Sequence, residues 1–120
     1  MIAYRYLYWA CAFGHIFIAH FILKKTGVSP FMAKEEEGKT PFMVAIEHNK
    51  DNIVELLLAK DWIYPSDPKL IARQRQATDK FGNNPMHKAC RFRNANMINM
   101  LLSEEIGALD QRNEFGKLPL

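Results

Sequence analysis

The sequence predicts an all-α solenoid of stacked antiparallel helix pairs, and two observations support this fold class. The stretch 38–61, GKTPFMVAIEHNKDNIVELLLAKD, has the pattern of two short apolar-faced helices joined by a tight turn. This pattern recurs on both sides, with Ala10, Ala45 and Ala89 at matching positions 35 and 44 residues apart. Two short helices cannot bury their apolar faces alone and need similar pairs beside them. We therefore expect one domain in which each pair shields the next.

The central pair has clear start and stop signals. Thr40 is expected to cap its first helix, and Pro41 suits the first turn, where a missing N–H costs nothing. Asn49 is expected to end this helix, because asparagine tolerates the left-handed conformation that a sharp turn requires. The buried ridge of the second helix should consist of apolar residues at helical spacing: Ile53, Val54, Leu56, Leu57 and Leu58.

The composition is that of an ordinary soluble domain, with 120 residues, 48% hydrophobic and 24% charged. A net charge of +3 is too small to indicate nucleic acid as the partner. The charge is uneven, because residues 1–34 carry four bases and no acid, whereas residues 35–62 carry seven acids and three bases. The two cysteines are too few for a disulfide framework, so a reducing, cytoplasmic location is expected.

The first 23 residues leave two interpretations open. The stretch 2–23 is apolar, about as long as a membrane span, and followed by two lysines. However, Arg5, His15 and His20 would then lie in hydrocarbon, and Gly14 interrupts the run. A signal peptide is disfavoured because no small-residue cleavage site follows. The favoured interpretation is a soluble helix pair.

This first pair can be placed in register with the central one. Gly14 corresponds to Asn49 at the turn, and Ile18 corresponds to Ile53 in the second helix. Gly27 is expected to end the second helix of the first pair. The acidic run 35–37 should be an exposed loop, with contact to a basic partner as the alternative.

The third copy begins at the turn 79–82 and opens its first helix at Asn84-Pro85. Its second helix should bury the following side chains: Met97, Ile98, Met100, Leu101 and Leu102. The nine additional residues before this copy should contain a short basic helix, which runs from Pro68 to about Arg75. A fourth copy starts at 113–120 and stops before any helix can form.

These repeats resemble the ankyrin family, whose first helix opens with a T-P-L-H motif. The segments 40–43, 84–87 and 118–120 are the nearest matches, and 107–110 is similar to the family's post-helix turn. The resemblance implies hairpin-like turn fingers that project from the stacked helices, and a concave protein-binding surface. It divides the chain into repeats at about 4–34, 35–62, 79–112 and a partial 113–120, with an insertion at 63–78.

The chain departs from the family pattern at several positions. The first copy has Arg5 and Tyr6 where threonine and proline belong, so its helix start should be poorly capped, by roughly 1 kcal/mol. Arg93 stands where the family uses glycine, and Asn94 is expected to take the left-handed conformation instead. The terminal copies lack polar outer faces, which favours a fragment of a longer array or a piece of an assembly.

Chemistry at the histidines and cysteines is not expected. No histidine lies at zinc-ligand spacing from cysteine or carboxylate residues, and Cys11 and Cys90 lie two repeats apart, beyond disulfide reach. Both cysteines should be small buried residues, and the proximity of His87 to Cys90 reflects structural roles in the repeat. No phosphate loop or nucleophile elbow is present. We expect no catalytic residue, cofactor or metal.

Two regions are candidates for partner binding, because aromatic and arginine side chains are favoured interface anchors. On the inner helices the candidates are Trp9, Phe13, Val44, Glu47, His48, Lys88, Arg91 and Phe92. Trp9 and Phe13 could equally pack under a preceding repeat. In the insertion, Lys69, Arg73 and Arg75 join Trp62, Ile63 and Tyr64 in an aromatic-basic cluster. The alternative is that these apolar residues anchor the loop and the bases are solvated.

The sequence therefore predicts a non-enzymatic scaffold that binds an unidentified protein partner through its concave face and turn fingers. It predicts no nucleic-acid binding and no direct membrane insertion. The main alternative is a cytoplasmic ankyrin segment of a membrane channel, or a fixed subunit of a large complex. An enzyme would need a catalytic domain outside these 120 residues.

Overall fold

The computed structural model describes residues 2–30, 38–58, 78–104, 106, 109 and 111–119. Six helices lie in these ranges: α1 (Ile2–Phe13), α2 (Ile16–Thr26), α3 (Pro41–Glu47), α4 (Asp51–Leu57), α6 (Pro85–Arg91) and α7 (Ala95–Ser103). The acidic run 35–37 and the insertion up to residue 77, including its expected basic helix and the candidate bases Lys69, Arg73 and Arg75, lie outside the described residues.

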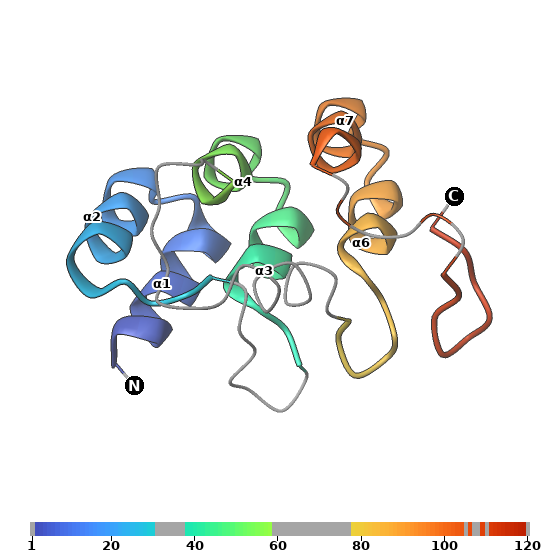
Figure 1. Cartoon of the computed structure of the whole chain (residues 1–120), viewed down its shortest axis with the longest axis horizontal. Coiled ribbons are helices and arrows are strands. Elements are labelled where there is room, and N and C mark those ends of the chain that lie inside the picture. Colours follow the sequence, from blue (N-terminus) through green and yellow to red (C-terminus); the bar gives the residue numbers. More distant parts are fainter. Residues whose placement is uncertain are drawn as a thin grey trace.

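The helices form two parallel layers (Figure 1). Helices α1, α3 and α6 lie side by side in one layer, and α2, α4 and α7 lie in the other. Each helix of the first layer packs against the helix that follows it in sequence, and each layer is also continuous along the stack. This arrangement confirms the predicted all-α stack of antiparallel helix pairs.

The first two helices form a pair and not a single span. Helix α1 has 12 residues and α2 has 11, and Gly14 lies between them in the left-handed region with φ 78°. The backbone N–H of His15 donates to the carbonyl of Ala10 at 2.9 Å, which closes the turn. Among the described residues, none of the helices has the length and hydropathy that crossing a membrane requires. The helix-pair interpretation of residues 2–23 is thus confirmed.

The predicted helix starts in the later copies are also confirmed. The Thr40 hydroxyl accepts from the Met43 N–H at 3.1 Å, with Pro41 in the first turn of α3. Asn84 accepts from the His87 N–H at 2.8 Å, and the His87 ring nitrogen Nδ1 accepts in return from the Asn84 N–H at 3.1 Å. This reciprocal pair satisfies two backbone donors that the helix leaves unpaired.

The start of the first copy differs from the prediction. Helix α1 begins at Ile2, so Arg5 and Tyr6 lie inside the helix and not at its capping position. Tyr4 is 5% exposed and its hydroxyl donates to the Lys39 carbonyl at 3.3 Å. The additional turn therefore buries a ring against the second copy. Burial of an aromatic side chain outweighs the cost of a missing cap.

The left-handed position in the third copy also differs. Arg93 itself adopts φ 54°, as Asn49 does at φ 60° in the second copy. The prediction that Asn94 would take this conformation is wrong, because Asn94 caps α7 with φ −84° and accepts from the Met97 N–H at 3.2 Å. One residue cannot both cap α7 and adopt the left-handed conformation, so the adjacent Arg93 adopts the strained positive φ.

Replacing Arg93 with glycine should therefore stabilise the chain by about 0.5–1 kcal/mol, because glycine adopts positive φ without steric cost. Part of the gain is offset by the greater freedom of glycine in the unfolded state. The free energy of unfolding from urea titration measures this change. Asn94→Gly is the matched control and should destabilise, because it removes a cap. A loss of stability in Arg93→Gly would contradict this account.

The buried ridges follow the predicted spacing in part: Leu56, Ile98 and Met100 are only half-buried, and two further ridge residues are exposed. Ile53 and Met97 are fully buried, but their counterpart Ile18 is 51% exposed, and Leu102 is 46% exposed. Ile53 and Met97 belong to second and third copies, which each pack against a preceding pair. Ile18 belongs to the first pair, which has no preceding pair among the described residues. The exposure of a ridge residue thus depends on its place in the stack.

Candidate functional site

Two turn fingers are built by acidic or amide side chains that bond to their own backbone. The Asp79 carboxylate accepts from the Phe81 and Asn83 N–H groups at 2.9 and 3.0 Å. Asn113 plays the same role in the next copy, accepting from Phe115 and Lys117 N–H at 2.9 Å each. Such side-chain bonds mimic a backbone turn and fix the loop.

The two fingers, at residues 79–83 and 113–117, contact each other. The Glu114 N–H donates to the Phe81 carbonyl at 2.8 Å, and the Phe81 and Phe115 rings stack with centroids 6.1 Å apart. Gly82 has φ 77°, and a Cβ there would lie 3.0 Å from the Glu114 backbone nitrogen. Only glycine allows this approach. The hairpin-like fingers expected from the sequence are confirmed here.

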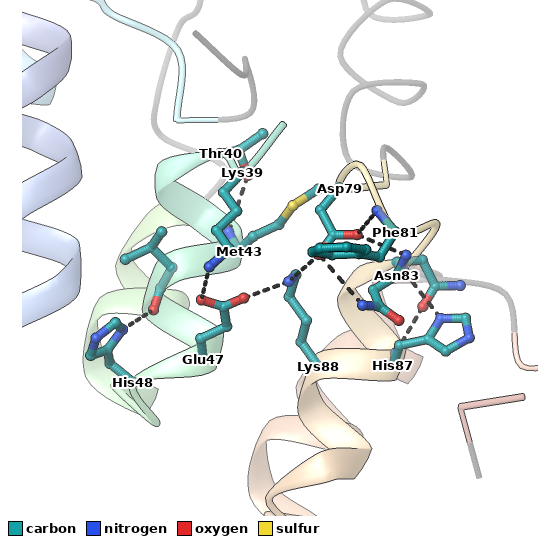
Figure 2. Close-up of polar contacts among 12 residues, drawn as sticks. Lys39, Thr40, Met43, Glu47, His48, Asp79, Phe81, Asn83, His87 and Lys88 are labelled. Atoms are coloured by element: carbon teal, nitrogen blue, oxygen red, sulfur yellow. Dashed lines mark hydrogen bonds and ion pairs between the residues drawn. The ribbon is translucent and has the colours of Figure 1, made fainter. Parts of the chain in front are cut away.

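A buried charge cluster joins α3, α6 and the first of these fingers (Figure 2). Lys88 on α6 is 5% exposed, and its ammonium donates to Asp79 at 2.9 Å and to Glu47 on α3. Lys39 also lies 3.4 Å from Glu47. The structure thus places Lys88 inside the stack, and not on the open concave surface as the sequence suggested. Val44, its counterpart on α3, is likewise buried.

The pKa of Asp79 reflects this environment. Burial raises the pKa of its carboxyl, but the hydrogen bond from Lys88, the two backbone N–H bonds and the charge of Lys88 lower it. The lowering effects win, so the pKa of Asp79 lies below its usual value. The carboxylate is therefore charged at neutral pH and holds the buried ammonium in place.

A groove of about 530 Å³ lies between α6 and the second finger. Its α6 side is lined by Cys90, Arg91 and Phe92, and its finger side by Phe115, Lys117 and Leu118. His87 also lines the groove. Its Nδ1 accepts a hydrogen bond from the Asn84 N–H, so the proton of the neutral ring is on Nε2. Nε2 donates to the Lys117 carbonyl at 2.9 Å. This bond fixes the finger relative to the helix.

The groove presents positive charge and aromatic surface. Arg91 and Phe92 are exposed, as are Phe115 and Lys117. Within the described ranges, no carboxylate lies at ion-pair distance from Arg91 or Lys117. Glu47 also borders the groove, but Lys39 and Lys88 neutralise it. The free cations and rings suit recognition of an anionic segment with an apolar side chain.

Exposed rings also mark the ends of the first-layer helices. Phe13, His48 and Phe92 occupy the same position in the three copies, and all three are exposed. The ring of His48 donates from Nδ1 to the Val44 carbonyl at 3.0 Å. Trp9 is 65% exposed and meets Phe13 edge-on, with centroids 6.4 Å apart. The candidates Phe13, His48, Arg91 and Phe92 are thus accessible, whereas Lys88 is not.

The cysteines differ in their environments. Cys11 is buried, and the loss of solvent raises the pKa of its thiol to about 12. Cys90 is only half-buried, because it borders the groove, so the expectation of full burial is wrong for this residue. Burial also raises the pKa of Cys90. In the part of the chain that the structure describes, no three His, Cys, Asp or Glu residues gather to form a metal site.

Comparison with known proteins agrees with this architecture. The model for ankyrin repeats (3 copies) matches residues 4–68, and the model for ankyrin repeats (many copies) matches residues 70–120. The chain belongs to the ankyrin-repeat family. Ankyrin repeats are generally protein–protein interaction modules and are typically non-enzymatic.

Two relatives contain similar ankyrin segments. The tyrosine-protein kinase Shark of Drosophila melanogaster is 30% identical over 100 residues, 83% of this chain and 10% of that protein. The human ankyrin repeat and LEM domain-containing protein 2 is 28% identical over 111 residues, 78% of this chain and 12% of that protein. The chain thus spans about a tenth of the length of these relatives.

Several residues of the site were not predicted from the sequence. Asp79, Phe115 and Lys117 were not among the candidates, although Asp79 and Asn113 begin similar tetrapeptides, DKFG and NEFG. An acidic or amide residue three positions before glycine signals a side-chain-capped turn. The sequence placed the starts of the third and fourth copies at these turns, and this signal could also have identified Asp79 and Asn113 as the residues that fix them. It could not have shown that they pack together.

Proposed function

We propose that this ankyrin segment is a non-enzymatic interaction module that binds a protein partner in the groove between α6 and the finger at 113–117. The observation that carries the proposal is the 530 Å³ groove with exposed Arg91 and Phe92 on one wall. Arginine and aromatic residues are the side chains that most often dominate binding energy. The row Phe13, His48 and Phe92 would extend the contact along the concave face.

The rigidity of the groove supports this role. The His87 bond to Lys117 and the contacts between the fingers hold both walls without a partner present. A preformed surface loses less conformational entropy on binding than a mobile one. The buried thiol of Cys11 suits a reducing, cytoplasmic location, which we propose for the chain. A segment of a channel or of a large complex remains the alternative, and it would use the same surface.

Substitutions at the exposed residues of the α6 wall should weaken partner binding without unfolding the stack. We expect Arg91→Glu and Phe92→Ala each to reduce the affinity for a purified partner by about tenfold or more, because each removes an exposed anchor. Partners would be captured with the 120-residue chain as bait, identified, and measured again by calorimetry. Thermal midpoints should stay within about 2 °C, because both side chains are exposed.

Arg93→Glu is the matched control, since Arg93 is an exposed base two residues away that does not line the groove. Its effect on affinity should be much smaller than that of Arg91→Glu. If Arg91→Glu and Phe92→Ala lowered stability as much as binding, these side chains would be structural, and the groove would lose its proposed role.

A further inference from the structure

A second apolar surface lies at the opposite end of the stack from the groove. It consists of large side chains of α1 and α2 that are 51–88% exposed: Tyr6, Trp9, Phe17, Ile18 and Phe21. These five residues form the end face. In Figure 1 the helices that carry it lie at the left, with α3 and α4 packed against their other side. Burying such rings is worth about 1.5–3 kcal/mol each, so an open surface of this kind is costly.

Repeat register shows what kind of surface the end face is. Trp9 corresponds to Lys88 on α6, and Lys88 bonds to Glu47 on the preceding helix α3. Phe17 corresponds to Asn96 on α7, which donates to Asp51 on α4 at 2.9 Å. Both counterparts therefore point toward the preceding helix pair. Val44 and Lys88, at the Trp9 position, are buried, whereas Asn52 and Asn96, at the Phe17 position, stay exposed. The end face therefore corresponds to the packed interface between pairs at Trp9 and to the rim of that interface at Phe17.

Ile18 and Phe21 of the end face also have counterparts that are covered inside the stack. Ile18 corresponds to Ile53 and Met97, which are both 0% exposed. Phe21 corresponds to Leu56 and Met100, which are half-buried against the core. At the interior interfaces a neighbouring helix pair provides this cover. By repeat register, the end face thus corresponds to a surface on which helices pack, in addition to being apolar.

Among the described residues, three bases lie next to the end face along its own helices. Arg5 lies one helical turn before Trp9, and Lys24 and Lys25 lie one turn after Phe21; all three bases are exposed. Residues 1–34 contain no aspartate or glutamate. At the interior interface, the groups that receive Lys88 and Asn96 are the carboxylates of Glu47 and Asp51. Charge complementarity therefore calls for carboxylates on the occupant.

We propose that the end face binds a helical segment of a protein partner, with large apolar side chains flanked by carboxylates. The register with helix-packing positions favours this occupant over an anionic lipid surface, which requires no such register. The positive charge of these three bases disfavours a second copy placed face to face, because Arg5, Lys24 and Lys25 of both copies would be brought together. This surface is distinct from the groove at α6, so the two proposals stand or fall separately.

The test uses Trp9 as its own reporter. The sequence has two tryptophans, so Trp62→Phe leaves Trp9 as the only one. The probe is a short helix-stabilised synthetic peptide with leucines on one side and glutamates on the other. We expect it to shift the Trp9 emission to the blue and to bind more weakly as salt rises. A peptide of the same leucines with lysines in place of glutamates should bind at least about tenfold more weakly.

Variants separate the apolar and charged contributions. Phe17→Ser removes the most exposed ring and should weaken peptide binding about tenfold or more, as should Arg5→Gln combined with Lys24→Gln and Lys25→Gln. Phe92→Ala, in the groove, should leave this affinity unchanged. Circular dichroism should show the same thermal midpoint for these variants as for their Trp62→Phe parent, because Phe17, Phe92 and the three bases are exposed.

Three results would overturn the proposal. The first is equal binding of the glutamate and lysine peptides. The second is binding to phosphatidylserine vesicles without binding to the acidic peptide, which would assign the end face to a membrane surface. The third is a dimer in sedimentation velocity that Phe17→Ser dissociates, which would assign it to a second copy.

Discussion

Replacing Lys88 with alanine is expected to destabilise the stack by about 3–5 kcal/mol at neutral pH, measured as the free energy of unfolding in urea. The Lys88 side chain is 6% exposed and its ammonium neutralises Asp79, which is 3% exposed in its side chain. Without the lysine, the Asp79 charge stays in a buried site, where the backbone N–H groups of Phe81 and Asn83 and the Asn83 side-chain amide are the remaining neutral donors. An unpaired buried charge costs far more than an exposed pair contributes.

The pH dependence provides a second measurement of the same cluster. Because the pKa of Asp79 is lowered in the folded state, its stabilising contribution is fully present above its unfolded value, about 3.9. This contribution is lost as the pH falls from about 4 through the folded pKa. Asp79→Asn should therefore reduce the stability at neutral pH and flatten the loss of stability in this acid range.

Exposed Lys80 supplies the control for the lysine, since Lys80→Ala should change the stability by no more than about 0.5 kcal/mol. Combining Lys88→Met with Asp79→Asn should recover part of the loss, because the variant pair removes both charges. If Lys88→Ala proved as mild as Lys80→Ala, the ammonium would not be holding the carboxylates as the structure describes.

Shortening Ile53 to alanine should cost about 2–5 kcal/mol, whereas the same substitution at Ile18 should cost less than about 1 kcal/mol. The two residues occupy the same position in successive copies, with identical side chains. Ile53 is fully buried, and Ile18 is 51% exposed. The difference between the two losses of stability therefore measures how much a neighbouring helix pair stabilises one isoleucine side chain.

Both free energies would come from chemical denaturation of the 120-residue chain, followed by circular dichroism. Leu57→Ala, at another fully buried position, should lose about as much stability as Ile53→Ala. Agreement between the two would show that the loss reflects burial and not a special feature of Ile53. Similar losses at Ile18 and Ile53 would mean that the end of the stack is covered as its middle is, and the end face would not exist as an open surface.

Local signals in the sequence located most elements because these signals act over a few residues. Thr40, Asn84 and Gly27 ended or began helices where their chemistry predicts. The prediction was wrong where one residue suited two structural roles and could fill only one of them. Asn94 suits both a cap and a left-handed turn, and only the folded chain shows that the cap takes precedence at Asn94 while Arg93 accepts the strained conformation.

The candidate site was less predictable than the fold, because it depends on distances between copies. Arg91 and Phe92 were identified from helical spacing and are exposed as expected. Lys88 lies on the same helix, and its burial depends on Glu47, 41 residues away, and on the finger at Asp79. A charged residue at such a position gives no local sign of its partners.

By itself, the sequence determined the repeat, the helix starts at Thr40 and Asn84 and the ankyrin family, because periodicity and capping are properties of short stretches of chain. The tertiary structure alone decided which equivalent positions are covered. Trp9 and Lys88 share one register position, yet the first is 65% exposed and the second 5%. The reason is physical: in a stack, burial depends on whether a neighbouring helix pair lies alongside, and the residue itself does not encode this.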